Sequence, residues 1–211
     1  MMVPAIVRLD ILFEAVSFIL SLAIASISFL AWRKVRSRTL LLFSLGFFLM
    51  ASAMLLRIVL VSLAFSSAST PPYLRARFFL LEFQETIYSL IRLVSYVVFL
   101  YLYAAYPLKR NGGLHVFAPV SLIYNPFFEA VSATILAFIV YQLATTTRDR
   151  QAGYATAGFI FLFISHLLFI ATPLSLNFYL LAQFIQMLSF ILFLTGVSTV
   201  LKHGERLSVE G

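Results

Sequence analysis

Long apolar runs separated by short polar breaks dominate the chain. Strand-like alternation is absent from these runs, and each is as long as a helix that crosses a bilayer, which needs about 20 apolar residues. Backbone groups in lipid must be bonded internally, which a helix achieves by itself. The pattern therefore predicts an all-α polytopic membrane bundle of six transmembrane helices, over residues 11–32, 39–65, 84–106, 127–146, 152–172 and 177–201.

Proline positions agree with these boundaries. All seven prolines fall near the proposed ends or in loops, and proline inside a helix removes a hydrogen bond and clashes with the preceding turn. The loops and tails are too short for a second domain, so residues 1–211 form a single transmembrane domain. Segment 115–124 is apolar but too short to span as a helix, and we expect it to lie in the interface or to re-enter the membrane.

Composition narrows the class of protein further. Hydrophobic residues make up 62% of the chain and charged residues only 11%, whereas soluble domains carry about 25% charged residues. The net charge of +7 comes from basic residues that apolar runs interrupt, so they form no phosphate-tracking face. These values exclude a soluble enzyme and a nucleic-acid-binding domain, and they make the lipid bilayer the first partner. Cysteine is absent, which excludes disulfides and thiolate sites.

Two halves of the chain resemble each other. The sequence FEAVS at 13–17 recurs at 128–132, the Gly-Phe pair at 46–47 meets a second pair at 158–159, and the third and sixth spans also align. The matches keep their order, which indicates two three-span units at about 1–110 and 115–203. Because each unit has an odd number of spans, we expect the copies to face opposite sides of the membrane. Such an inverted 3+3 repeat is common among secondary transporters.

Basic residues give a weak prediction of orientation. If every span alternates in direction, the two sides of the membrane hold six and seven basic loop residues, which decides nothing. The densest short basic loop contains Arg33, Lys34, Arg36 and Arg38. Dense Lys/Arg in a short loop weighs most in the positive-inside rule, so we expect this loop in the cytoplasm and both termini outside the cell membrane. It serves as a topology signal and is also able to attract anionic lipid headgroups. An even balance also permits dual insertion and an antiparallel homodimer.

Charged and amide side chains within the spans are the candidates for function, because they are costly in lipid and usually face the bundle interior. Glu14 and Glu129 are repeat equivalents near the starts of the first and fourth spans. On the third span, steps of four and three residues place polar side chains on one helix face, and the sixth span repeats this stripe. We expect a polar path between the units, lined by Glu14, Glu129, Arg92, Gln186, Glu85, Ser89 and Gln183.

Other interpretations of the same residues are open. The polar stripes can be interhelical hydrogen-bond glue, with Arg92 paired to a glutamate. Arg57 is placed near the far end of its span, where we expect it to snorkel to the interface. His166 lies deep in the fifth span without a second histidine at comparable depth, so we expect a hydrogen-bonded interior residue rather than a metal or haem ligand.

Function is predicted only by class. The sequence holds no nucleophile, metalloprotease or phosphate-loop motif, so we expect no enzyme activity, cofactor or metal. The first hypothesis is a small transporter or channel-like carrier with a polar site between the two units. The alternative is a non-catalytic membrane subunit, sensor or anchor module, acting as a homodimer or with other membrane subunits of a larger complex.

Overall fold

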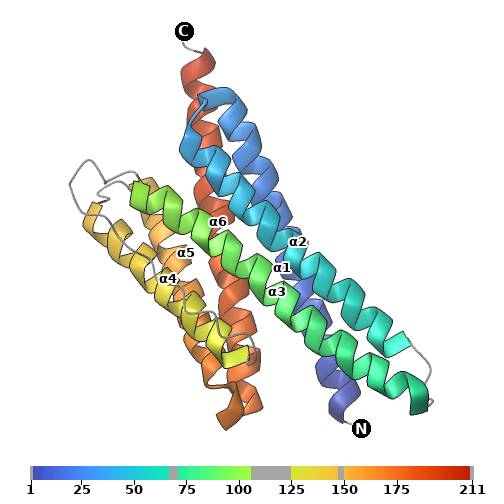
Figure 1. The fold of residues 1–211 in the computed structure, drawn as a ribbon. Helices are drawn as coiled ribbons and strands as arrows, with labels where there is room; N and C mark the ends of the chain where they lie inside the picture. The colour runs from blue at the N-terminus through green and yellow to red at the C-terminus, as the bar shows by residue number, and fades with distance from the viewer. Residues whose placement is uncertain (1, 67–70, 106–124, 147–149, 210–211) are drawn as a thin grey trace.

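Six long helices make up the fold, which is known from a computed structural model (Figure 1). The structure describes residues 2–66, 71–105, 125–146 and 150–209. Its helices are α1 (Met2–Val35), α2 (Arg38–Ser66), α3 (Pro71–Ala105), α4 (Asn125–Thr146), α5 (Arg150–Ile170) and α6 (Leu176–Val209), with a short 3-10 helix η1 (Thr172–Leu174) before α6. No strand occurs in these residues, so the prediction of an all-α chain is confirmed for them.

Each helix is long and apolar enough to cross a membrane. The candidate spans are Leu9–Val35, Arg38–Leu63, Phe83–Ala104, Phe127–Thr145, Gly153–Ile170 and Asn177–Lys202, each within a few residues of its predicted range. Large apolar side chains on all six helices face outward; they include Ile19, Phe48, Val94, Tyr141, Leu167 and Phe184. Such a surface is unfavourable in water and matches hydrocarbon. The helices therefore fit a multi-pass membrane protein. Segment 115–124 lies outside the described residues.

The helices form a closed ring. Each packs against its two neighbours in chain order, and the ring closes where α1 contacts α6. Consequently the first helix of each three-helix unit packs on the third helix of the other, as α1 on α6 and α4 on α3. The interior of the ring is therefore built from both units.

Helix directions follow from the residues that meet at each end of the ring. Asp10 and Glu14, early in α1, meet Arg57, late in α2, and Tyr179, early in α6. Glu129, early in α4, meets His166, late in α5. At the other end, one pocket collects the start of α2, the start of α5 and the late parts of α3, α4 and α6. Thus α1, α3, α4 and α6 run one way and α2 and α5 run the other (Figure 1).

The expected inversion of the two units is therefore not confirmed. Both units run in the direction up, down, up, because α3 and α4 are parallel neighbours in the ring (Figure 1). An inverted repeat requires that consecutive spans alternate in direction. α3 instead ends, and α4 begins, at opposite ends of the ring, so the second unit starts from the same end as the first (Figure 1).

The termini also differ from expectation. The N-terminus lies at the end of the ring that carries Asp10, and the C-terminal part of α6 projects from the opposite end (Figure 1). If all six helices cross one membrane, the termini lie on opposite sides of it. The described helices therefore do not support the expectation that both termini are external.

Aromatic rings fill the middle of the ring of helices. Phe43, Phe47, Phe99, Phe159 and Phe193 are each at most 6% exposed, and neighbouring rings have centroids 4.7–5.7 Å apart. Edge-to-face and tilted pairs of this kind stabilise beyond the area they bury. We call these five residues the aromatic plug. It draws on α2, α3, α5 and α6, so it fastens the two units together.

Two glycines allow the plug to form. A Cβ at Gly46 would lie 2.3 Å from Phe99 Cε1, and a Cβ at Gly158 would lie 2.7 Å from Phe193 Cε1. The neighbouring serines secure the same helix pairs: Ser95 Oγ donates to the Gly46 carbonyl at 2.6 Å, and Ser189 Oγ donates to the Gly158 carbonyl at 2.7 Å. Each unit thus joins its second and third helices by the same device.

We expect Gly46→Ala to lower the free energy of unfolding by about 1–3 kcal/mol, because overpacking a rigid aromatic core displaces rings that other rings hold. The matched control is Gly153→Ala on α5, where a Cβ meets nothing within 4 Å. That change should be neutral or stabilising by up to about 1 kcal/mol through helix propensity. Denaturation in detergent micelles measures both, and equal effects at the two glycines would contradict the close packing of Gly46.

Candidate functional site

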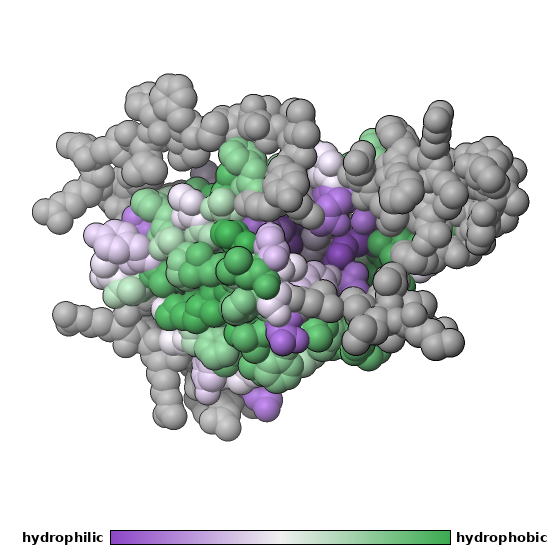
Figure 2. Space-filling view, turned by 90° about the horizontal axis from the view of Figure 1, so that it is seen from below, coloured by the Kyte–Doolittle hydropathy of each residue, from purple (hydrophilic) through white to green (hydrophobic). Residues whose placement is uncertain are grey.

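A cavity of about 480 Å³ lies inside the ring, on the N-terminal side of the aromatic plug. Its walls come from α2 to α6 and η1, and they consist of Arg57, Glu85, Tyr88, Arg92, Glu129, Phe169, Thr172, Pro173, Tyr179 and Gln183. Along α3 the order is Glu85, Tyr88, Arg92 and then Phe99, which places the plug at the inner end. Figure 2 looks at the end of the molecule that carries the N-terminus and shows hydrophilic side chains recessed between apolar ones.

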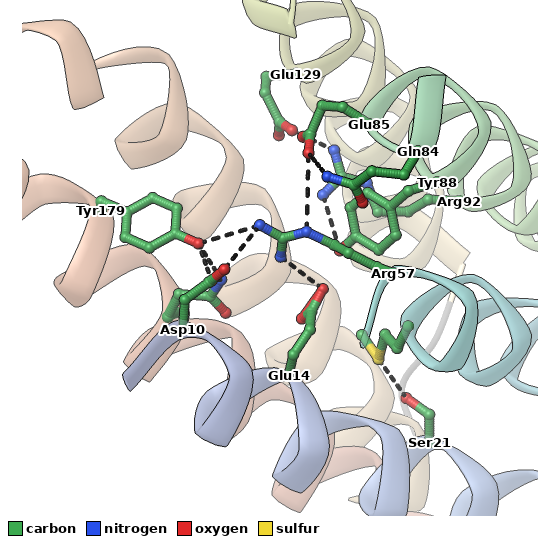
Figure 3. Close-up of polar contacts among 12 residues, drawn as sticks. Asp10, Glu14, Ser21, Arg57, Gln84, Glu85, Tyr88, Arg92, Glu129 and Tyr179 are labelled. Atoms are coloured by element: carbon green, nitrogen blue, oxygen red, sulfur yellow. Dashed lines mark hydrogen bonds and ion pairs between the residues drawn. The ribbon is translucent and has the colours of Figure 1, made fainter. Parts of the chain in front are cut away.

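Arg57 is the centre of the first ion-pair cluster (Figure 3). Its Nη1 donates to Glu14 Oε1 at 2.8 Å, its Nη2 donates to Asp10 Oδ2 at 3.1 Å, and its Nε lies 3.8 Å from Glu85 Oε2. The Arg57 side chain is 12% exposed and that of Glu14 only 2%. One guanidinium therefore ties together α1, α2 and α3, and three carboxylates offset the cost of burying it.

Tyr179 and Gln183 connect this cluster to α6. The Tyr179 hydroxyl donates to Asp10 Oδ1 and accepts from Arg57 Nη2 at 3.4 Å. Gln183 Nε2 donates to the Tyr179 hydroxyl at 3.1 Å, and its Oε1 is buried without a hydrogen-bond partner. The seam between α1 and α6 is thus polar at the level of the cavity.

Glu129 is the centre of the second cluster. One of its oxygens pairs with Arg92 Nη2 on α3, and the other bonds His166 Nδ1 on α5. His166 Nε2 lies 2.7 Å from the Tyr96 hydroxyl. A neutral histidine that donates from Nδ1 to Glu129 and accepts from Tyr96 satisfies both contacts. This chain is buried and joins α3, α4 and α5, whereas Glu129 and Arg92 also reach the cavity wall.

Tyr88 stands between the two arginines. The Arg57 guanidinium carbon lies 5.1 Å from the centre of the Tyr88 ring, and that of Arg92 lies 4.9 Å from it. A desolvated cation–π contact stabilises by about 2 kcal/mol or more. The wall of the cavity therefore already holds two cations against an aromatic surface.

The structure brings most of the predicted path residues together. Four of the seven line the cavity: Glu129, Arg92, Glu85 and Gln183. Glu14 lies behind the wall as a partner of Arg57. Ser89 and Gln186 are buried at 1% exposure but do not line the cavity. Arg92 does pair with a glutamate, and the glutamate comes from the other unit.

Sequence reasoning missed three polar members of the site, and one of its expectations is wrong. Arg57 does not snorkel, because Asp10, Glu14 and Glu85 converge on it inside the ring. Asp10 lies four residues before Glu14 on the same helix face, a spacing that could have indicated it. Tyr88 and Tyr179 carried no comparable signal, because tyrosines near span ends usually mark the interface. His166 is hydrogen bonded and fully buried, as expected.

Metal binding finds no support among the described residues, which contain no group of three or more His, Asp or Glu able to hold an ion. The arrangement is instead suited to holding charge within a low-dielectric bundle. No family model, curated protein or solved structure matched the chain.

Proposed function

We propose that the chain is a small carrier of the cell membrane and that the cavity is its binding site. The observation that supports this is the cavity itself, whose ionisable walls are supplied by both three-helix units. The aromatic plug lies farther along the ring, beyond Arg92 and Tyr96 on α3. Many soluble ligands occupy cavities of about 300–1,000 Å³. A polar cavity that packed aromatic rings separate from the other end of the bundle is what a carrier presents when it is open to one side only.

We further propose that the units are a tandem repeat related by an axis along the ring. Two features support it: the equivalent serine–glycine hydrogen bonds, and the packing of each first helix on the third helix of the other unit. Parallel repeats related by an axis along the membrane normal occur in secondary transporters. Two similar bodies that meet at a plug can rock against each other and open the cavity alternately to the two sides.

The positive-inside rule supports one orientation of this ring. In the described helices and the turn 36–37, the end that carries the C-terminus holds Arg33, Lys34, Arg36, Arg38, Arg150, Lys202 and Arg206, and the other end holds Arg8, Arg75 and Arg77. Because Lys and Arg favour the cytoplasm, we place the C-terminus inside and the N-terminus outside. The cavity then faces the exterior. A bias of this size argues against dual insertion.

A labelling experiment tests the carrier. The chain contains no cysteine, so Gln186→Cys introduces a single thiol between the inner end of the cavity and Phe190 of the core. In proteoliposomes of known orientation, we expect a membrane-impermeant maleimide to react from the N-terminal side and, more slowly, from the C-terminal side. Ser26→Cys, an exposed position in the middle of α1, is the control and should be unreactive from both sides.

A thiol at position 186 that is reached from one side only, at every temperature tested, would contradict alternating access. It would favour the second candidate, a non-catalytic membrane subunit, sensor or anchor of a larger complex or a homodimer. That alternative is supported by the ion pairs around the cavity, which bond one another as interhelical glue does. We expect no enzyme activity in either case.

A further inference from the structure

The described side chains that line the cavity or bond its wall carry an excess of negative charge. Among the described side chains, those that line it or bond its wall include two guanidinium groups, of Arg57 and Arg92, and four carboxylates, of Asp10, Glu14, Glu85 and Glu129. His166, which bonds Glu129, adds a positive charge only when it is protonated. We propose that the cavity binds a small organic cation, an ammonium group on an apolar body, with Glu85 as its counter-ion. This inference rests on the proposed function for the place of the site.

Carboxylates in direct contact already neutralise both arginines of the cavity. Glu14 and Asp10 hold the two terminal nitrogens of Arg57 at 2.8 and 3.1 Å, and Glu129 holds Arg92. Each guanidinium thus has a carboxylate in direct contact without help from Glu85. An anionic ligand would have to displace one of these partners and would meet the remaining carboxylates. A cationic ligand can bind without displacing either arginine, and the excess carboxylate charge attracts it.

Glu85 is the carboxylate best placed to meet a ligand. Its side chain is 29% exposed, compared with 17% for Asp10, 10% for Glu129 and 2% for Glu14. Its contact with Arg57 Nε, at 3.8 Å, is also longer than the Asp10 and Glu14 contacts of that guanidinium. Glu85 also accepts a hydrogen bond from Gln84 Nε2 at 3.4 Å. As the most exposed of these four carboxylates, it can accept an ammonium group from the cavity in addition to the contacts it already makes.

Other parts of the wall suit the rest of such a molecule. Phe169 and Tyr179 form an aromatic pair on the wall, with ring centres 5.7 Å apart, that can take an apolar group or the face of a cation. Gln183 Oε1, buried on the same wall without a hydrogen-bond partner, is an acceptor suited to an N–H donor. The two faces of the cavity thus differ, and a one-ended organic cation matches both.

Three probes of nearly equal size separate the charge classes: benzylammonium, benzyl alcohol and benzoate. Isothermal titration of the full-length chain in detergent at pH 7 should show benzylammonium binding at least about tenfold more tightly than the other two. Glu85→Gln should weaken benzylammonium about tenfold or more, because hydrogen bonds to charged groups contribute that much. Glu85→Asp should retain most of the preference, and Arg33→Gln, at the opposite end, should not change it.

Three results of the titrations would contradict a cation site. Benzoate binding as tight as benzylammonium, no binding of any probe, or an unchanged affinity in a folded Glu85→Gln protein would overturn the cation site. Unfolding midpoints of both Glu85 variants show whether they are folded. Labelling at position 186 is independent of the probes. A chain that binds benzoate and is still labelled from both sides would therefore refute the cation site but not the carrier function. A chain that binds benzylammonium but is labelled from one side only would refute the carrier function but not the cation site.

Discussion

Replacing Arg57 with glutamine should lower the free energy of unfolding by about 3–5 kcal/mol, the range found when one partner of a buried ion pair is removed. The reason is that Asp10, Glu14 and Glu85 would then lie inside the bundle without their shared cation. Arg57→Lys should be intermediate, because an ammonium keeps the charge but cannot reach three carboxylates with separate nitrogens. Denaturation in mixed micelles at pH 7 provides the measurement.

Two control variants test whether the loss of stability comes from the buried cluster. Arg38→Gln removes a charge from an exposed residue at the start of α2 and should change stability by no more than about 0.5 kcal/mol. Adding Glu14→Gln to Arg57→Gln should recover part of the loss, since it removes the most buried carboxylate of the three. A cost for Arg57→Gln no larger than that of Arg38→Gln would show that the cluster is solvated.

The second large effect is expected at Glu129. Glu129→Gln deprives Arg92, whose side chain is 3% exposed, of its counter-ion and weakens the bond to His166. The expected loss is again about 3–5 kcal/mol, because a charge is left buried and unpaired. The same denaturation series, with α-helical circular dichroism as the readout, measures it.

A double-mutant cycle separates pairing from packing. Arg92→Gln combined with Glu129→Gln removes both charges, so the double variant should cost less than the sum of the two single variants. The control pair is Arg57→Gln with Glu129→Gln, because these two residues do not contact each other. Their losses in the free energy of unfolding should be closer to additive. If the Arg92 and Glu129 variants were themselves additive, the ion pair would not be the source of the stability.

The six helices could be predicted from sequence because their physical cause is local. A run of apolar residues long enough to cross the bilayer specifies a helix whatever it packs against. The boundaries agree to within a few residues, and the helix-disrupting prolines lie near them; Pro173 is an example, in η1 between α5 and α6.

Helix direction could not be predicted in the same way. Alternation was assumed for every span, and it fails once, between α3 and α4, which run in parallel. That single failure also produced the even balance of six and seven basic residues. With α4 to α6 in their observed directions, the C-terminal end of the ring holds more of the basic residues that the structure describes.

Three of the four carboxylates of the site and Arg92 were predicted, whereas Arg57 and Asp10 were missed. Glu14 and Glu129 were found because a repeated sequence carries both, and repetition is visible in one dimension. The place of Arg57 depends on how far α1, α2 and α3 extend and on which of their faces meet, and no local pattern encodes that. Asp10 lies one residue before the predicted first span, 11–32, and was not singled out, although it shares a helix face with Glu14.

The aromatic plug has an electrical consequence. If water fills the cavity, it brings the potential of one bulk phase to the level of Arg92, so the membrane voltage falls mainly over the plug and the helix ends beyond it. Moving one elementary charge through 100 mV changes its energy by about 2.3 kcal/mol. Most of that work would be done where Phe47, Phe99 and Phe193 meet. If the chain carries a cation as proposed, the step that moves it past these rings should depend on voltage, and the step that loads the cavity should not.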